Sequence, residues 1–181
     1  MAVAGSRRRA EYCLLGLDFG FHSPEAGAII RIDTDNVWDL TDEYYRTGRT
    51  QEEIENDLRA VRNQIPFREV YPDSEDPARI ESMKRAGFAC RDVDKNVALG
   101  VSRVRELIKK RQFFVFNTCH NALDEFNSYR YDPEKPKEQP IKENDHLMDA
   151  LRYAVYNHRS GTSVMPRPTT GLVKPLPGMA A

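Results

Sequence analysis

Short apolar runs separated by polar turns fill the first quarter of the chain. Residues 12–18 are mostly apolar and end in Asp18, and Gly20 follows closely. A run of this length predicts a buried strand with the aspartate at its carboxyl end. Residues 26–32 and 36–45 predict two further strands. The polar turn between them, at 33–36, predicts that the three strands form an antiparallel meander.

Beyond the meander, apolar residues recur at helical spacing. Across residues 50–64, Ile54 and Leu58 fall on one face, and Thr50 and Glu53 have the spacing of a capping box. Helices and short strands then alternate to the end of the folded part. The same patterns predict strands at 69–73, 88–93 and 112–116, and helices at 77–86, 96–111, 119–129 and 145–158.

Together these elements predict an α/β fold: a mixed sheet built on a three-stranded antiparallel meander, with helices on both faces. We expect one folded domain at residues 12–158. Residues 1–11, which include three consecutive arginines, predict a flexible basic N-terminus or linker. Residues 130–142 predict an exposed loop or irregular hairpin. Residues 159–181 are rich in Gly and Pro and predict a disordered tail.

Composition excludes several classes of protein. The chain is 40% hydrophobic and 30% charged, as in ordinary globular proteins, and no apolar run is long enough to cross a membrane. Its net charge of -1 does not by itself indicate nucleic-acid binding, so such contacts would need local basic patches. The three cysteines are widely spaced and predict reduced thiols, with no second half of a zinc site beside Cys119.

Acidic residues stand where the predicted elements begin or end. Asp18 ends the first strand, and Asp73 ends the first strand after the meander. Asp145, His146 and Asp149 open the last helix at spacings of three and four residues, so they can share one of its faces. Each acid alone also suits a turn, a cap or a solvated helix face. Their shared position at element ends favours a common site instead.

Carboxylates brought together repel one another unless protons or a cation intervene. A ligand set made mainly of oxygens favours Mg²⁺ or Mn²⁺ over zinc. Two such ions about 4 Å apart can activate water and stabilise the leaving oxygen in phosphodiester hydrolysis. The pattern therefore predicts a metal site suited to phosphodiester chemistry.

At this point the sequence resembles a known family. The order of strand and aspartate, meander, strand and aspartate, and terminal helix with aspartate resembles the RNase H-like fold of the ribonuclease H, resolvase and integrase superfamily. The sequence motifs are similar to those of the C-terminal nuclease domain of phage terminase large subunits, over about residues 12–158. The matching segments are GLDFG at 16–20, DSEDPARI at 73–80 and NDHLMDALRY at 144–153. The last of these is the most specific.

The resemblance implies roles for individual residues. It makes Asp18, Asp73 and Asp149 the metal-binding catalytic acids. It places Asp145 as an auxiliary metal ligand and His146 as a proton or phosphate partner at the rim. Which acid of the helix binds the metal directly is left open between Asp145 and Asp149.

Two basic residues are candidates for binding DNA phosphates, Lys95 and Arg152. Each also has an ordinary interpretation: Lys95 as a lysine at a helix start, and Arg152 as a solvated helix arginine.

The resemblance implies an endonuclease that uses two Mg²⁺ or Mn²⁺ ions to cut concatemeric double-stranded viral DNA during genome packaging in the host cytoplasm. The partners it implies are double-stranded DNA, the terminase ATPase domain, the small terminase subunit and the portal protein, with no membrane. The GxxxxGK[ST] phosphate loop of the packaging ATPase is missing from this sequence. The chain is therefore expected to be the isolated nuclease domain.

Three other interpretations stay open. A cellular Holliday-junction resolvase or RNase H shares the superfamily but is disfavoured by the last helix. An actin- or sugar-kinase-like ATPase also begins with a strand ending in Asp-x-Gly, but it needs a second Gly-rich phosphate loop, which is not found. A non-catalytic module that docks on portal or capsid proteins gives no reason to assemble three acids.

Overall fold

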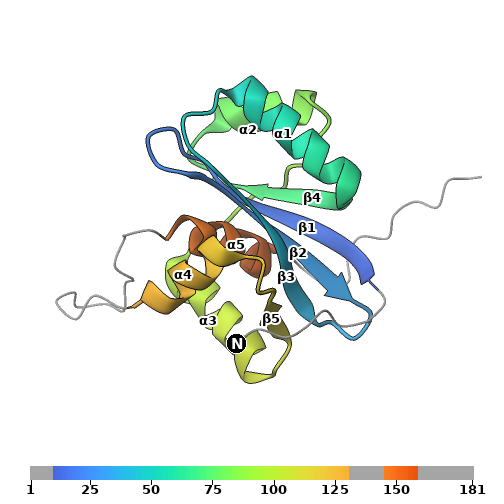
Figure 1. The fold of residues 1–181 in the computed structure, drawn as a ribbon, viewed down its shortest axis with the longest axis vertical. Helices are drawn as coiled ribbons and strands as arrows, with labels where there is room; N and C mark the ends of the chain where they lie inside the picture. Colours follow the sequence, from blue (N-terminus) through green and yellow to red (C-terminus); the bar gives the residue numbers. More distant parts are fainter. Residues whose placement is uncertain (1–9, 131–144, 159–181) are drawn as a thin grey trace, which may run out of the picture.

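The computed structural model describes residues 10–130 and 145–158, which fold around a five-stranded mixed sheet (Figure 1). The strand order is β4-β1-β2-β3-β5. The first three strands form the predicted antiparallel meander, while β4 runs parallel to β1 and β5 runs parallel to β3. The strands are β1 (Ala10–Asp18), β2 (Glu25–Asp33), β3 (Trp38–Arg46), β4 (Phe67–Pro72) and β5 (Phe113–Val115).

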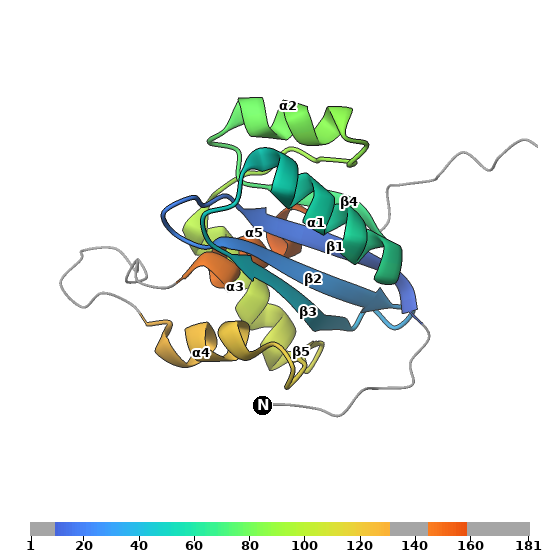
Figure 2. The same ribbon diagram turned by 45° about the horizontal axis from the view of Figure 1, so that its top comes forward.

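Helices cover both faces of the sheet, as predicted. The first two lie on one face and the last three on the other (Figures 1 and 2). Each group encloses its own apolar core, so the sheet is buried on both sides. The helices are α1 (Gln51–Gln64), α2 (Pro77–Arg85), α3 (Val97–Lys109), α4 (His120–Ser128) and α5 (His146–Asn157).

Burial on both faces explains why β1 is apolar almost throughout. Side chains alternate across a strand, so Leu15 and Leu17 join the core beneath α1 and α2, while Leu14 joins the core beneath α5. Asp18 has the same parity as Leu14. It therefore faces α5 at the point where β1 ends.

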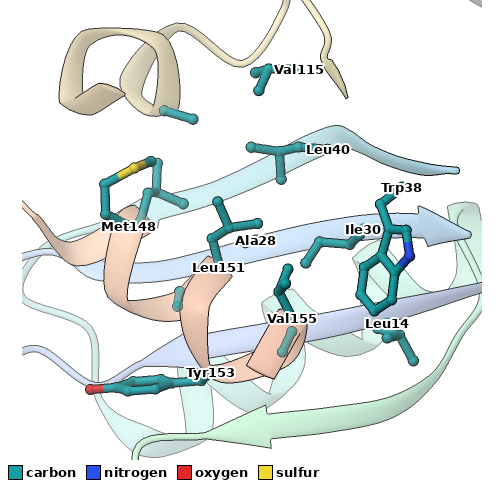
Figure 3. Packing of buried hydrophobic residues seen from close by; sticks show 14 of the residues in the cluster. Leu14, Ala28, Ile30, Trp38, Leu40, Val115, Met148, Leu151, Tyr153 and Val155 are labelled. Carbon is teal, nitrogen blue, oxygen red and sulfur yellow. The ribbon is translucent and has the colours of Figure 1, made fainter. Parts of the chain in front are cut away.

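The last helix is the centre of the larger core. Figure 3 shows Met148, Leu151 and Val155 of α5 packed over the sheet, near Ala28 and Ile30 of β2. Eight of the twelve residues of α5 are buried. The helix is therefore fixed to the sheet along its length.

A glycine in β1 permits this close packing. A Cβ atom built on Gly16 would stand 1.9 Å from the carbonyl oxygen of Ala150 in α5, far inside van der Waals contact. No residue larger than glycine fits there without moving the helix. Gly16 thus sets the distance between the strand that ends in Asp18 and the helix that carries Asp149.

The predicted helix starts are confirmed. Thr50 and Glu53 form the reciprocal capping box of α1. Asp76 caps α2, and Pro77 occupies its first turn. The other elements match their predicted ranges to within a few residues at each end.

The predicted strand at 88–93 is wrong. In that stretch only Cys90 pairs with β4, through a single bridge to Val70. After Cys90 the chain turns toward α5, where the backbone N–H of Asp94 donates to the Asn157 side chain at 2.8 Å. The local pattern suited a strand, but the segment leaves the sheet edge after one residue.

Some expectations concern residues outside the described ranges. The tail at 159–181, the loop after Arg130 and residues 1–9 lie there. Ala10 and Glu11, expected in the flexible N-terminus, belong to β1. No helix in the described part of the chain has the length and apolarity needed to span a membrane.

A buried histidine ends α5 at the far end of the sheet from Asp18. His158 accepts or donates hydrogen bonds through both ring nitrogens, at 2.9 Å to the hydroxyl of Tyr12 and 2.8 Å to that of Tyr71. Its Nδ1 lies 3.3 Å from the Glu69 carboxylate. Burial lowers the pKa of His158, and the nearby negative charge of Glu69 only partly opposes this.

This histidine should make the fold sensitive to acid. Because its pKa is lower in the folded than in the unfolded chain, the unfolded chain binds the proton first as pH falls below about 6.5. We expect wild type to lose up to about 1.4 kcal/mol per pH unit from this group between that pH and the folded-state pKa. His158→Gln should lose less over the same interval in urea-unfolding titrations. Parallel pH curves for the two proteins would contradict this assignment.

Candidate metal centre

Two aspartates meet at the carboxyl ends of neighbouring parallel strands. Leu17 of β1 is in register with Pro72 of β4, and the backbone N–H of Asp73 donates to the carbonyl oxygen of Leu17 at 2.8 Å. The next residues along each strand direction, Asp18 and Asp73, therefore lie side by side. Both are 8% exposed. The predicted juxtaposition of these acids at one sheet edge is present.

The first turn of α5 faces the same edge. Nδ1 of His146 lies 3.0 Å from Oδ2 of Asp18. Asp149 is in the same turn, three residues after His146. Burial raises the pKa of Asp18; the hydrogen bond with His146 opposes this, and the charges of Asp149 and Asp73 raise the pKa further. The three carboxylates are thus close enough to repel one another.

Each of the three carboxylates has a different basic partner. His146 contacts Asp18, as described. The Lys95 ammonium lies 2.8 Å and 3.0 Å from the two oxygens of Asp73. The Arg152 guanidinium lies 2.8 Å from Oδ1 of Asp149. These basic side chains offset the negative charge of the carboxylates.

The two basic candidates differ in their surroundings. Arg152 is only 3% exposed, so its interpretation as a solvated helix arginine is wrong. It also donates to the carbonyl oxygen of Lys95 at 3.0 Å, and its stem fills the space above Gly100, where a Cβ would come within 2.3 Å of it. The Lys95 side chain is 26% exposed and also contacts the exposed Glu75. Of the two, Lys95 is the one that can reach solvent.

Asp145 occupies the N-cap position of α5. Its carbonyl oxygen accepts from the backbone N–H of Asp149 at 2.8 Å, but its side chain makes no capping hydrogen bond. The hydrogen bond with Asp18 raises the pKa of His146, and the charges of Asp18, Glu125 and Asp145 act in the same direction against burial. The structure thus places Asp145 within electrostatic reach of His146.

The donor set fits a hard divalent cation, although its atoms are not gathered around one point. Within the described ranges, no three His, Cys, Asp or Glu side chains are arranged closely enough to hold a metal ion. Burial raises the pKa of Asp18, and the charges of Asp149 and Asp73 add to this; a bound cation would relieve the repulsion among these carboxylates. Asp18, Asp73 and Asp149 supply oxygens, the donors that Mg²⁺ and Mn²⁺ prefer. To bind one cation together, Asp73 would have to turn from Lys95 and Asp149 from Arg152.

Tyr153 is a member of the site that the sequence analysis missed. Its hydroxyl lies 3.5 Å from Oδ2 of Asp149. Burial raises the pKa of Tyr153, and the charges of Asp149, Asp18 and Asp73 raise it further, so its phenol stays protonated among the acids. The signal was present in the sequence, because Tyr153 stands four residues after Asp149 on one helix.

A second missed pair secures the backbone after Asp18. The carboxylate of Glu25 is buried and accepts from the backbone N–H of Gly20 at 3.1 Å. Arg79 of α2 forms an ion pair with the same carboxylate at 2.7 Å and lies over the ring of Phe19. These contacts tie the turn after β1 to α2, which limits the movement of Asp18. No local sequence pattern indicates this pairing.

Glu125 of α4 is the fourth missed residue. It is 4% exposed, and its Oε2 accepts from the backbone N–H of Met148 in α5 at 3.0 Å. Burial raises the pKa of Glu125 to about 7, while hydrogen bonds from the backbone of Met148 and Leu147 favour its ionised form. This carboxylate joins α4 to the turn that carries His146.

Acids from β1, the end of β4 and the first turn of α5 thus meet at one edge of a meander-based sheet, which is the arrangement of RNase H-like nucleases. Comparison with known proteins narrows this class. Residues 15–158 match the family described as "Terminase RNaseH-like domain". The chain belongs to this family. The match favours the terminase interpretation over the junction resolvase and the kinase-like ATPase.

Curated relatives are the large subunits of phage terminases. The chain is 25% identical over 157 residues to that of Escherichia phage T5, covering 82% of this chain and 36% of the relative. It is 27% identical over 161 residues to that of Salmonella phage P22, covering 82% of this chain and 32% of the relative. The chain therefore spans about a third of the length of these relatives.

Solved structures share the fold. The large terminase of a thermophilic bacteriophage in complex with ADP superposes with a TM-score of 0.80 at 24% identity, over 86% of this chain and 42% of that one. The nuclease domain of the P22 large terminase gives 0.66 at 25% identity, covering 80% of each chain. The nuclease domain of the bacteriophage SPP1 large terminase, with bound Mn, gives 0.67 at 22% identity over 81% of this chain and 86% of that one.

Proposed function

We propose that this chain is a metal-dependent endonuclease, the nuclease part of a terminase large subunit, and that it cuts concatemeric double-stranded viral DNA during packaging. The observation that carries the proposal is the meeting of Asp18, Asp73 and the first turn of α5 at one sheet edge. Family membership and the manganese in the SPP1 relative support it.

The proposed metal ligands are Asp18, Asp73 and Asp149, with Asp145 as an auxiliary ligand. Two bound Mg²⁺ or Mn²⁺ ions would lower the pKa of a water molecule and stabilise the leaving 3′ oxygen. The hydrogen bond with Asp18 raises the pKa of His146, which favours the protonated form of this imidazole at the rim. It is therefore suited to donate a hydrogen bond to a phosphate or to the departing oxygen.

The basic residues divide into two roles in this proposal. Lys95 reaches solvent and contacts Asp73, so it can turn from that carboxylate to a DNA phosphate when a cation takes its place. Arg152 is buried between Asp149 and the Lys95 backbone, which suits it to orient Asp149. Of the two predicted phosphate-binding residues, Lys95 is the stronger candidate.

The likeness to terminase large subunits supports a proposal for the wider setting of this chain. A net charge of -1 gives this chain little general attraction for DNA, so the proposed motor supplies the duplex through other parts. These are the terminase ATPase domain, the small terminase subunit and the portal protein, acting in the host cytoplasm. The chain covers about a third of its relatives and 80% of the P22 nuclease domain, which supports its correspondence to their nuclease segment.

Metal removal tests this function. Supercoiled plasmid incubated with the protein and Mn²⁺ or Mg²⁺ should become nicked and linear, since the acids need a cation to act. Treatment with excess EDTA should stop cleavage, and restoring free Mn²⁺ should recover it. Cleavage that continues in EDTA, or no cleavage with either ion, would rule out a metal-dependent nuclease.

A further inference from the structure

Two helices on the α5 side of the sheet lack a side-chain cap at their own N-cap residue. Cys119 precedes α4 and Asp145 precedes α5, and neither side chain makes a capping hydrogen bond. The first N–H groups of a helix have no partner within it, so a buried helix start needs acceptors from elsewhere. In both helices a glutamate from another element supplies them.

Glu43 of β3 caps the N-terminus of α4. Its Oε1 accepts from the backbone N–H of Asn121 at 3.0 Å and from that residue's side-chain amide at 2.7 Å, and its Oε2 accepts from the backbone N–H of Ala122 at 2.9 Å. This cap holds the start of α4 against the edge of the meander.

Glu125, one turn further along α4, serves α5 in the same way. Its Oε2 accepts from the backbone N–H of Met148 at 3.0 Å, and its Oε1 accepts from the hydroxyl of Tyr45 at 3.2 Å. The carboxylate is buried, so water does not compete for these donors. A carboxylate at a helix N-terminus is also favoured by the helix dipole.

We propose that Glu125 is a positioning residue of the metal centre: by capping α5 from α4, it holds the turn on which His146 and Asp149 face Asp18. The expected effect on the metal centre rests on the proposed nuclease function. The hydrogen bonds that cap α5 do not depend on that function. The capped N–H belongs to Met148, between His146 and Asp149 in the same turn. Glu125 itself acts through the backbone of α5.

The effect should be local. The rest of α5 is fixed by its packing on the sheet and by the close approach at Gly16. Removal of the cap therefore frees the first turn while the later turns stay in place. A residue that merely stabilised the domain would loosen the whole helix evenly.

Glu125→Ala, compared with Glu43→Ala, tests the proposal in the full chain. Glu43→Ala removes the same kind of cap from α4 and is the matched control. Hydrogen exchange of the amides at 146–149 and at 153–157 reports on the two ends of α5. Mn²⁺ affinity, measured by paramagnetic resonance, reports on the site without requiring cleavage. Glu125→Gln keeps one acceptor oxygen and serves as the milder variant where alanine prevents folding.

We expect Glu125→Ala to speed exchange at 146–149 at least tenfold relative to 153–157, and to weaken Mn²⁺ binding at least threefold. Glu125→Gln should fall between this variant and wild type. Glu43→Ala should speed exchange at the start of α4 and leave both readouts of α5 near wild type. Unchanged exchange at 146–149 in both Glu125 variants would overturn the proposal, as would equal effects of Glu43→Ala. A wild-type protein that binds no Mn²⁺ would overturn the nuclease function instead, while the exchange result still decides the cap.

Discussion

Replacing Asp18 with asparagine should abolish DNA cleavage and raise the melting temperature of the metal-free protein. Cleavage should fall about a thousandfold or more, because the amide lacks the charge that binds a divalent cation. Stability should rise because burial and the charges of Asp149 and Asp73 disfavour the Asp18 carboxylate. A gain on the order of 1 kcal/mol corresponds to a few degrees in a domain of this size.

The pH dependence of this gain gives a stricter test. A carboxyl whose pKa is raised on folding contributes stability that is fully present below its unfolded pKa and is lost as pH rises through the folded one. The advantage of Asp18→Asn should therefore be present at neutral pH and vanish in acid. Calorimetry across the pH range measures it. A melting temperature below that of wild type at neutral pH would contradict a crowded acidic site.

Two further variants test whether the gain in stability comes from the crowded site or from the lower total charge. Asp73→Asn should also stop cleavage, but without the gain in stability, since Lys95 loses a charged partner there. Asp92→Asn changes an exposed aspartate on the loop before α3 and should leave both cleavage and melting unchanged. If Asp92→Asn reproduced the gain, total charge rather than the site would explain it.

The second large effect is expected at Gly16. Gly16→Ala places a methyl group 1.9 Å from the Ala150 carbonyl oxygen, and backbone atoms on both sides prevent easy relief. We expect a loss of about 3 kcal/mol or more, because overpacking in a core displaces whole elements. Any folded fraction should cut poorly, since α5 moves away from the strand that carries Asp18. Urea unfolding and plasmid cleavage measure the two effects.

Gly27→Ala is the matched control, a glycine in the neighbouring strand β2. A Cβ there would meet the side chains of Tyr44 and Leu15 at 3.1 Å and 3.2 Å. These distances are only a few tenths of an ångström too short, far less than at Gly16, so the cost should stay below about 1 kcal/mol. If both variants lost the same free energy of unfolding, the close approach of α5 would not be the reason that glycine is needed at position 16.

The sequence predicted those features that depend on local pattern and on simple topology. Apolar runs identified β1, β2 and β3, and helical spacing identified α1 and α5. The meeting of Asp18 and Asp73 follows from their places at strand ends, once β1 and β4 are parallel neighbours. The acid positions were therefore predictable without any contact between them being known.

Features that depend on contacts across the fold were not predictable in the same way. Arg152 has the spacing of a solvated charge, and its burial arises from the space left above Gly100 on another helix. In the sequence Glu125 has the position of an ordinary acidic residue on a helix. Its role depends on partners in α5 and β3, which the sequence does not place beside it. The segment at 88–93 has a strand's composition but lacks a partner beyond one residue.

The packing of α5 into the larger core has a consequence for the chain while it is being synthesised. The elements from β1 to α4 carry two of the three proposed catalytic acids, whereas the third arrives on the last described helix, which also supplies much of the larger core. A chain still emerging from the ribosome, or one cut before residue 145, has neither a closed core nor a full ligand set. The closed core and the proposed ligand set are therefore completed together, when α5 packs onto the sheet.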